Sequence, residues 1–81
     1  MIQVVFSGAL RTAVEDVESL SMDVSSIDEL LRRLTLRFPK IEPLLESGIA
    51  VAINGEIYRD NWHVAIPKDA EVFLLPRIQG G

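Results

Sequence analysis

The fold is decided in the middle of the chain, by the stretch SIDELLRRLTLRF at residues 26–38. Ser26, followed three residues later by Glu29, forms a capping-box pattern, in which each side chain satisfies a backbone N–H group at the start of a helix. Asp28 and Glu29 also place negative charge at the positive end of the helix dipole. The pattern therefore predicts a helix that begins directly after Ser26.

Apolar residues recur along one side of this helix at the spacing of an amphipathic helix that packs on a core. They are Ile27, Leu30, Leu31, Leu34 and Phe38. Pro39 disfavours helical backbone at the residue before it, so we expect the helix to end at Phe38. Arg32, Arg33 and Arg37 lie off the apolar stripe. They form either a solvated helix face, the simpler interpretation, or a basic docking patch.

Two strand patterns precede the helix. The first, over residues 1–7, alternates apolar and polar positions, although Val5 places an apolar residue on the polar side. The second, over residues 17–24, alternates more cleanly. The apolar positions are Ile2, Val4 and Phe6 in the first and Leu20, Met22 and Val24 in the second. These patterns predict a hairpin, with a turn at Gly8 and a long connecting loop over residues 9–16.

Further strands are predicted after the helix, beyond a short helical turn near residues 41–45. Residues 49–53 alternate aliphatic residues with alanine, and Asn54-Gly55 is the strongest two-residue hairpin signal, because a type I′ turn needs positive φ at both positions. Residues 56–59 are expected to return as a short strand. Trp62 is expected to cover one end of the core, although a partner anchor is the alternative. A turn at residues 67–70 then leads into a last strand at 71–75.

This order of elements predicts an α+β fold. The first and last strands can pair in parallel at the centre of a mixed sheet, with the helix crossing one face. That arrangement is a β-grasp, or ubiquitin-like, fold, and we expect it to form a single domain over residues 1–81.

The last strand is apolar on both of its faces. If Val72 and Leu74 point toward the helix, then Phe73 and Leu75 point away from it. A fully buried strand is the alternative, but one helix cannot easily cover both faces of a sheet in a chain this short. We therefore expect an exposed apolar patch, extended by Ile57 or Tyr58, and such patches tend to mark interaction surfaces.

The chain closes with LLPRIQGG at residues 74–81. Pro76 cannot donate to a sheet ladder, so we expect the strand to end there and residues 76–81 to form a flexible tail. Five extended residues beyond Pro76 reach roughly 15–18 Å, and Gly80-Gly81 can pass through a narrow channel because glycine has no Cβ. The pattern favours a terminus presented to another protein's active site, with the Gly81 carboxylate as the reactive group. A frayed end is the alternative.

The composition excludes several classes of protein. Of the 81 residues, 48% are hydrophobic and 25% charged, which is typical of a folded domain. A net charge of −4 argues against a nucleic-acid partner. Without cysteine, and with a single histidine, the sequence shows no thiolate nucleophile and no metal site. No apolar run reaches the roughly 18 residues of a membrane span, and no signal peptide is visible, so we expect a cytoplasmic protein without a membrane partner.

Taken together, the segments resemble the MoaD/ThiS group of ubiquitin-like sulfur carriers over essentially the whole chain. The segments that carry the resemblance are Ile2–Phe6 with Leu10-Arg11, the helix at 26–38, Val51–Gly55, Lys68–Val72 and Leu75–Gly81. The ending is the most specific piece, since these carriers end on Gly-Gly after a proline-containing segment. The length and the hairpin-helix-turn region look more like MoaD, the small subunit of molybdopterin synthase, than like the more compact ThiS.

The resemblance implies a cycle of activation and sulfur transfer. An E1-like adenylating enzyme of the MoeB/ThiF type would use ATP to adenylate the carboxylate of Gly81. A sulfur donor would then displace AMP and leave a C-terminal thiocarboxylate. The carrier would not be an enzyme and would bind no cofactor itself. The tail would next enter a MoaE-type large subunit and deliver sulfur to a pterin precursor in molybdenum cofactor biosynthesis.

The same resemblance assigns roles to particular residues. Gly81 would carry the reactive group, and Gly80, Gln79, Ile78 and Arg77 would hold the tail in the channel of the partner. A docking patch for the partner would comprise Phe73, Leu75 and Ile57.

Three alternatives stay open at this stage. The sulfur acceptor could belong to thiamin or cysteine biosynthesis instead. The chain could be a protein modifier, joined through Gly81 to lysines of its targets. It could also be a β-grasp binding module in which Gly80-Gly81 is incidental. A stand-alone enzyme has the least support, because no nucleophile, metal cluster or acid–base pair is visible in the sequence.

Overall fold

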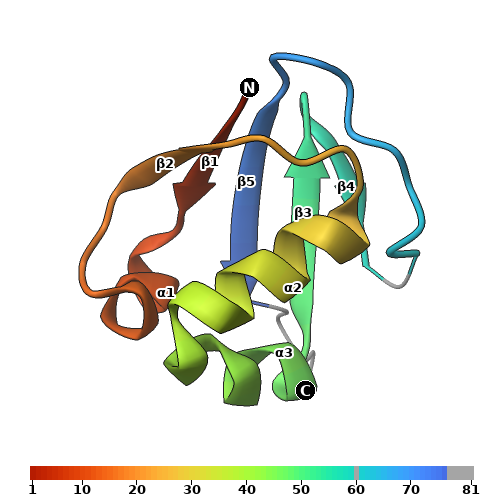
Figure 1. The fold of residues 1–81 in the computed structure, drawn as a ribbon. Coiled ribbons are helices and arrows are strands. Elements are labelled where there is room, and N and C mark those ends of the chain that lie inside the picture. The colour runs from red at the N-terminus through yellow and green to blue at the C-terminus, as the bar shows by residue number, and fades with distance from the viewer. Residues whose placement is uncertain (60, 77–81) are drawn as a thin grey trace.

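The computed structural model describes residues 1–59 and 61–76, which form a sheet with helices on one face (Figure 1). The strands are β1 (Ile2–Phe6), β2 (Ser19–Met22), β3 (Ile49–Ile53), β4 (Glu56–Tyr58) and β5 (Glu71–Pro76). The helices are α1 (Gly8–Arg11), α2 (Ile27–Arg37) and α3 (Glu42–Ser47), with 3-10 turns at Thr12–Val14 and Pro39–Ile41.

The strands lie in the order β2-β1-β5-β3-β4. The central pair, β1 and β5, is parallel, and the remaining pairs are antiparallel. Because α2 follows the β1–β2 hairpin and crosses one face of the sheet (Figure 1), the α+β, β-grasp architecture predicted from the sequence is confirmed.

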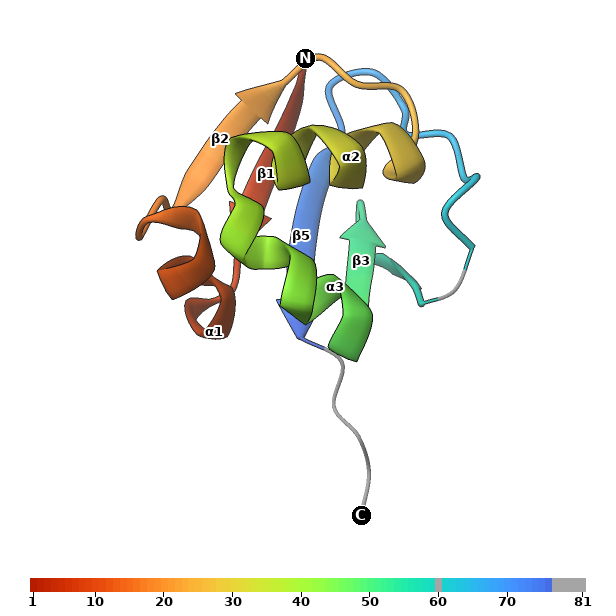
Figure 2. The same ribbon diagram turned by 60° about the horizontal axis from the view of Figure 1, so that its bottom comes forward.

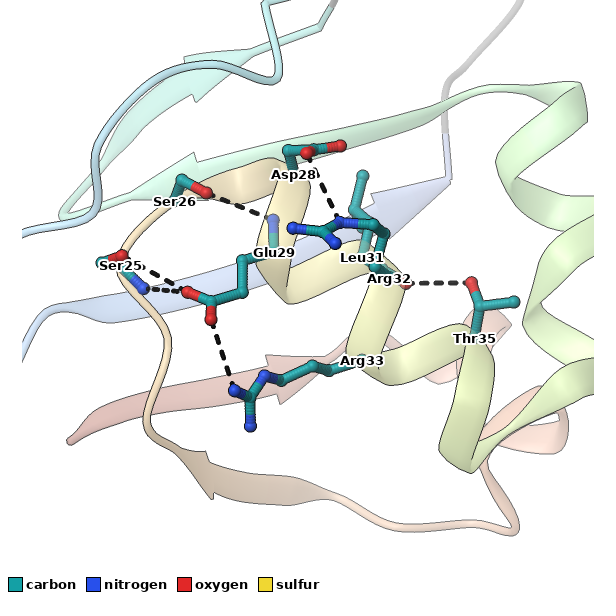
Figure 3. A network of polar contacts seen from close by, with 8 residues as sticks. All are labelled: Ser25, Ser26, Asp28, Glu29, Leu31, Arg32, Arg33 and Thr35. Carbon is teal, nitrogen blue, oxygen red and sulfur yellow. Dashed lines mark hydrogen bonds and ion pairs between the residues drawn. The ribbon is translucent and has the colours of Figure 1, made fainter.

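The start of α2 is held by the predicted cap, in a slightly different form (Figure 3). The Ser26 hydroxyl accepts from the Glu29 N–H at 3.2 Å. The Glu29 carboxylate accepts from the backbone N–H of Ser25 at 2.9 Å, one residue earlier than in a standard capping box. The bonds that the Glu29 carboxylate accepts from Ser25, first from its backbone N–H and then from its hydroxyl, together with the charge of Arg33, hold the pKa of Glu29 below its ordinary value.

The irregular segment before β5 also caps α2. The first two backbone N–H groups of the helix, those of Ile27 and Asp28, donate to the carbonyl oxygens of Val64 and Trp62 at 3.1 and 2.8 Å. These N–H groups have no partner inside a helix. The segment is therefore tied to α2 by backbone bonds, which brings the Trp62 side chain onto the edge of the core, where it is partly buried as expected.

The core lies between α2 and the sheet. Ile27, Leu30 and Leu34 of α2 are fully buried against strand residues that are equally inaccessible to solvent, namely Val4, Val51, Val72 and Leu74. The two arginines of the central turn form ion pairs within the helix, Arg32 with Asp28 at 3.4 Å and Arg33 with Glu29 at 3.3 Å. This agrees with the solvated-face interpretation of these two residues.

The prediction of a turn and loop over residues 8–16 was wrong. Residues 8–14 form α1 and a 3-10 turn instead, and Leu10, Ala13 and Val14 are buried. α1 contacts β5, so this segment closes an end of the core that α2 does not reach. Its apolar residues are too few to show a helical period in the sequence. Glu15 and Asp16 then take positive φ values of 56° and 62° and end the segment.

The other turns agree with their predictions. Asn54 and Gly55 have φ values of 48° and 91°, as a type I′ turn requires. The backbone N–H of Ala70 donates to the carbonyl of Pro67 at 3.2 Å, which closes the turn before β5. Pro76 is the last residue of β5, opposite Ile49, one residue beyond the predicted strand. Residues 77–81 of the predicted tail lie outside the described residues.

Replacing Leu34 tests the contact between helix and sheet. Leu34→Ala should lower the free energy of unfolding by roughly 2–5 kcal/mol, because it opens a cavity in a fully buried site. Urea unfolding followed by circular dichroism measures the change. The matched control is Leu36→Ala, the same deletion on the same helix at a side chain that is 83% exposed, and it should change stability little. Equal losses in the two variants would contradict the packing described above.

The Glu29 cap predicts a dependence of stability on pH. Because the folded-state pKa of Glu29 lies below its ordinary value of 4.5, its stabilising effect is present above that value and is lost as the pH falls through the folded-state pKa. Glu29→Gln should therefore be less stable than the wild type at pH 7, with the difference shrinking toward pH 3. Thermal unfolding at both pH values measures it, and a difference that does not depend on pH would contradict the role of the carboxylate.

Candidate functional site

The face of the sheet opposite α2 carries the predicted apolar patch. Along β5, Val72 and Leu74 are fully buried, whereas Phe73 is 39% exposed and Leu75 is partly buried. α2 and α3 both lie over the other face of the sheet (Figure 2). Alternation along β5 therefore divides its side chains between the core and this open face, as the sequence predicted.

The strand register assembles a continuous apolar row on the open face. Val5 of β1 lies opposite Phe73, Phe73 lies opposite Ala52 of β3, and Ala52 lies opposite Ile57 of β4. We call these four residues the docking row. Phe73 and Ile57, which is 52% exposed, stand two strand spacings apart, about 10 Å. Ala52 forms a low floor between them, so the row has relief that a partner side chain could fill.

The docking row crosses the middle of β5, where Phe73 is the third of six residues. One step further along, Leu75 lies opposite Ala50 and continues the apolar surface. In the other direction the face turns polar, because Gln3 lies opposite both Glu71 and Ser21. The Ser21 hydroxyl donates to the Gln3 side chain at 2.9 Å. The apolar surface is thus next to Pro76, the residue after which the predicted tail begins.

The structure brings Phe73, Leu75 and Ile57 to one face, as predicted. Tyr58, the alternative extension of the patch, does not belong to it. Tyr58 lies opposite Val51, on the face that α2 covers, and packs against the core. Its hydroxyl donates to the Glu56 carboxylate, which raises the pKa of Tyr58.

Sequence reasoning missed three residues of this surface: Val5, Ala50 and Ala52. The signal for Val5 was visible as the single apolar residue on the polar side of its strand. It is explained by its position beside Phe73. The alanines carried no such signal, because they simply alternate with the aliphatic residues of β3. All five residues of that strand are buried. The predicted tail residues Arg77, Ile78, Gln79, Gly80 and Gly81 lie outside the described residues.

The described part of the site can bind and position but holds no reactive group. The side chains of the docking row are aliphatic or aromatic, without an acid, a base or a nucleophile. Within residues 1–59 and 61–76, no three His, Cys, Asp or Glu side chains gather where they could hold a metal ion. No helix in these ranges is both long and apolar enough to span a membrane.

Solved structures share this fold at low sequence identity. A chain of the BexX/CysO complex from Amycolatopsis orientalis superposes with a TM-score of 0.79 at 19% identity, covering 100% of both chains. The small archaeal modifier protein 1 of Methanosarcina acetivorans has a TM-score of 0.78 at 20% identity, covering 99% of this chain and 95% of its own.

A third similar structure is the complex of subunits 1 and 2 of the molybdopterin-converting factor from Helicobacter pylori. The chain that matches has a TM-score of 0.68 at 22% identity, covering 99% of this chain and 97% of its own.

The sequence itself assigns the family. A comparison with curated proteins found no match, but residues 4–81 match the ThiS family. The match begins within β1, covers the other four strands in full and continues through the last residue. The chain therefore belongs to the ThiS family of small ubiquitin-like sulfur carriers, which act with partner enzymes and are not enzymes themselves.

Proposed function

We propose that this chain carries sulfur as a thiocarboxylate on Gly81. The observation that carries the proposal is the family match through residue 81, which includes Gly80-Gly81. An E1-like enzyme of the MoeB/ThiF type joins the Gly81 carboxylate to the α-phosphate of ATP and releases pyrophosphate, so that AMP replaces a poor leaving group. A sulfur donor that supplies hydrosulfide then attacks the carbonyl carbon through sulfur, and AMP leaves as the thiocarboxylate forms. The sulfur is held on the backbone terminus, so the chain needs no cysteine for this chemistry.

The fold contributes to this reaction by fixing the point from which the C-terminal segment starts. β5 is hydrogen-bonded between β1 and β3 up to its last residues, so the chain leaves the sheet from a fixed point. The docking row and Leu75 hold the partner beside that point. Five extended residues then reach roughly 15–18 Å into the active site of the partner. There Arg77, Ile78 and Gln79 contact the walls of the channel, and Gly80 allows the narrow passage.

For the acceptor of the sulfur, we propose the pterin precursor of molybdopterin, with a MoaE-type large subunit as the partner. Support comes from the structural similarity to one chain of a molybdopterin-converting factor complex, which extends over nearly the whole length of both chains. Thiamin and cysteine biosynthesis are the alternative destinations, and conjugation to proteins is a third. Incubating the thiocarboxylated carrier with a MoaE-type subunit and pterin precursor distinguishes them, since only the proposed acceptor yields a dithiolene product in that mixture.

Intact mass spectrometry tests the carrier chemistry. After co-expression with an E1-like enzyme and a sulfur source, the chain should gain the mass of one oxygen replaced by sulfur, localised to Gly81. A variant that lacks Gly81 should show no gain while keeping the same melting temperature, because the core of the described part of the chain is formed by residues between Ile2 and Leu74. An unmodified terminus in the presence of an active E1-like enzyme, ATP and sulfur donor would argue for a modifier or a plain binding module.

Substituting Phe73 tests the docking row. Phe73→Asp should weaken binding to the E1-like enzyme and to the large subunit at least tenfold, roughly 1.4 kcal/mol, because it places a charge at the centre of an apolar contact. The matched control is Ser21→Asp, which adds the same charge to the polar part of the same face and should bind normally. Titration calorimetry measures both. Wild-type affinity in Phe73→Asp would exclude the docking row as the contact surface.

A further inference from the structure

A second apolar surface lies on the helical side of the molecule. It is a hollow of about 540 Å³ between α2, α3 and the segment that contains Trp62. Its apolar lining is Leu31, Leu36, Leu45 and Trp62, and its polar lining is Asp28, Arg32, Thr35 and Glu42. We call it the α2–α3 groove. It lies on the face of the sheet opposite the docking row, so the proposed carrier chemistry makes no use of it.

One wall of the groove is an apolar ridge. Leu36 is 83% exposed, more than any other large apolar side chain in the described part of the chain. It lines the α2–α3 groove on one side and a second hollow on its other side, which Arg37 also lines. An exposed aliphatic ridge beside an apolar groove is the arrangement by which two helix surfaces interlock.

The charges around the groove show what kind of side chain it accepts. Asp28 and Arg32 neutralise each other across one turn of α2 (Figure 3). The Thr35 hydroxyl is already bonded to the carbonyl of Leu31 at 2.9 Å. Glu42 makes no ion pair with any residue in ranges 1–59 and 61–76. The groove therefore combines an apolar floor with one uncompensated negative charge, and it fits an aliphatic side chain that is followed by a cation.

Leu36 and Arg37 form that combination on the same surface. Arg37 has no ion-pair partner within the described ranges, and its guanidinium lies 5.5 Å from the centre of the Phe38 ring. One surface thus carries both an apolar groove with a free acid and an apolar ridge with a free base. Such self-complementarity is what a two-fold symmetric contact requires.

We propose that the α2–α3 groove binds a second copy of this chain, with Leu36 of each copy inserted into the groove of the other. Around the two-fold axis, Arg37 of each copy faces Glu42 of its partner. The contact consists of one inserted side chain and one ion pair from each copy, which is little for a stable protein interface. The dimer is therefore weak and reversible. Because the docking rows lie on the opposite faces, both copies keep their docking rows and the ends of β5 accessible.

Sedimentation equilibrium over roughly 10 µM to 1 mM tests the dimer, since weak association appears in this range. The average mass of the wild type should rise toward twice the monomer mass. Leu36→Glu should stay monomeric, with an unchanged circular dichroism spectrum because the side chain is exposed. Phe73→Asp, on the open face, should associate as the wild type does. A constant wild-type mass would overturn the proposal, as would association that is lost in Phe73→Asp but kept in Leu36→Glu.

A charge exchange tests the orientation. Arg37→Glu and Glu42→Lys should each weaken association about tenfold, because each places like charges across the two-fold axis. The double variant, and an equimolar mixture of the two single variants, should regain the wild-type affinity. A double variant no stronger than the single ones would overturn the pairing. Leu36→Glu should still acquire the thiocarboxylate, so failure of the dimer and failure of the proposed function are distinguishable.

Discussion

The parallel pairing of β1 with β5 at the centre of the sheet is the constraint on which the rest of the structure depends. β5 is the last strand in the sequence, yet it is inserted between β1 and β3, so both of its edges are hydrogen-bonded. Its side chains alternate between a core that stabilises the fold and a face that remains accessible. A central strand that leads directly into the segment proposed to carry the sulfur gives that segment a rigid origin, which a loop or an edge strand would not provide.

The size of the chain explains why this sheet has an open face. A domain of 81 residues is too small to cover both faces of a five-stranded sheet. Here one main helix with two short ones covers a single side. The apolar residues left over on the other side form a row across the middle of the sheet at Phe73, which continues to Leu75. The core and the proposed docking row therefore lie on opposite faces of the same strands, and substitutions on one face need not affect the other.

Most of the charged residues of α2 form contacts within the chain rather than a site for a partner. Four of them form two ion pairs along the helix, and Glu29 also bonds to the chain before the helix. Exposed ion pairs of this kind contribute little stability each. Their effect here is to leave Arg37 as the charged residue of α2 without an ion pair in the described part of the chain. The proposed contact between two copies on this side therefore depends on Arg37, Glu42 and the exposed Leu36.

The sequence by itself determined the features whose causes are local. The cap at Ser26, the turn at Asn54-Gly55 and the alternation along β5 each depend on neighbouring residues. Together they were sufficient to predict the β-grasp order of elements and the position of Phe73, Leu75 and Ile57 on the open face. Only the tertiary structure decided which side chains meet. Strand register placed Val5 and Ala52 beside Phe73 and turned Tyr58 away, and chain folding brought Leu36, Leu45 and Trp62 around one groove. Register and helix packing arise between segments far apart in the sequence, and a segment as short as residues 8–14 has too few residues to show its period. For these features, no local pattern exists.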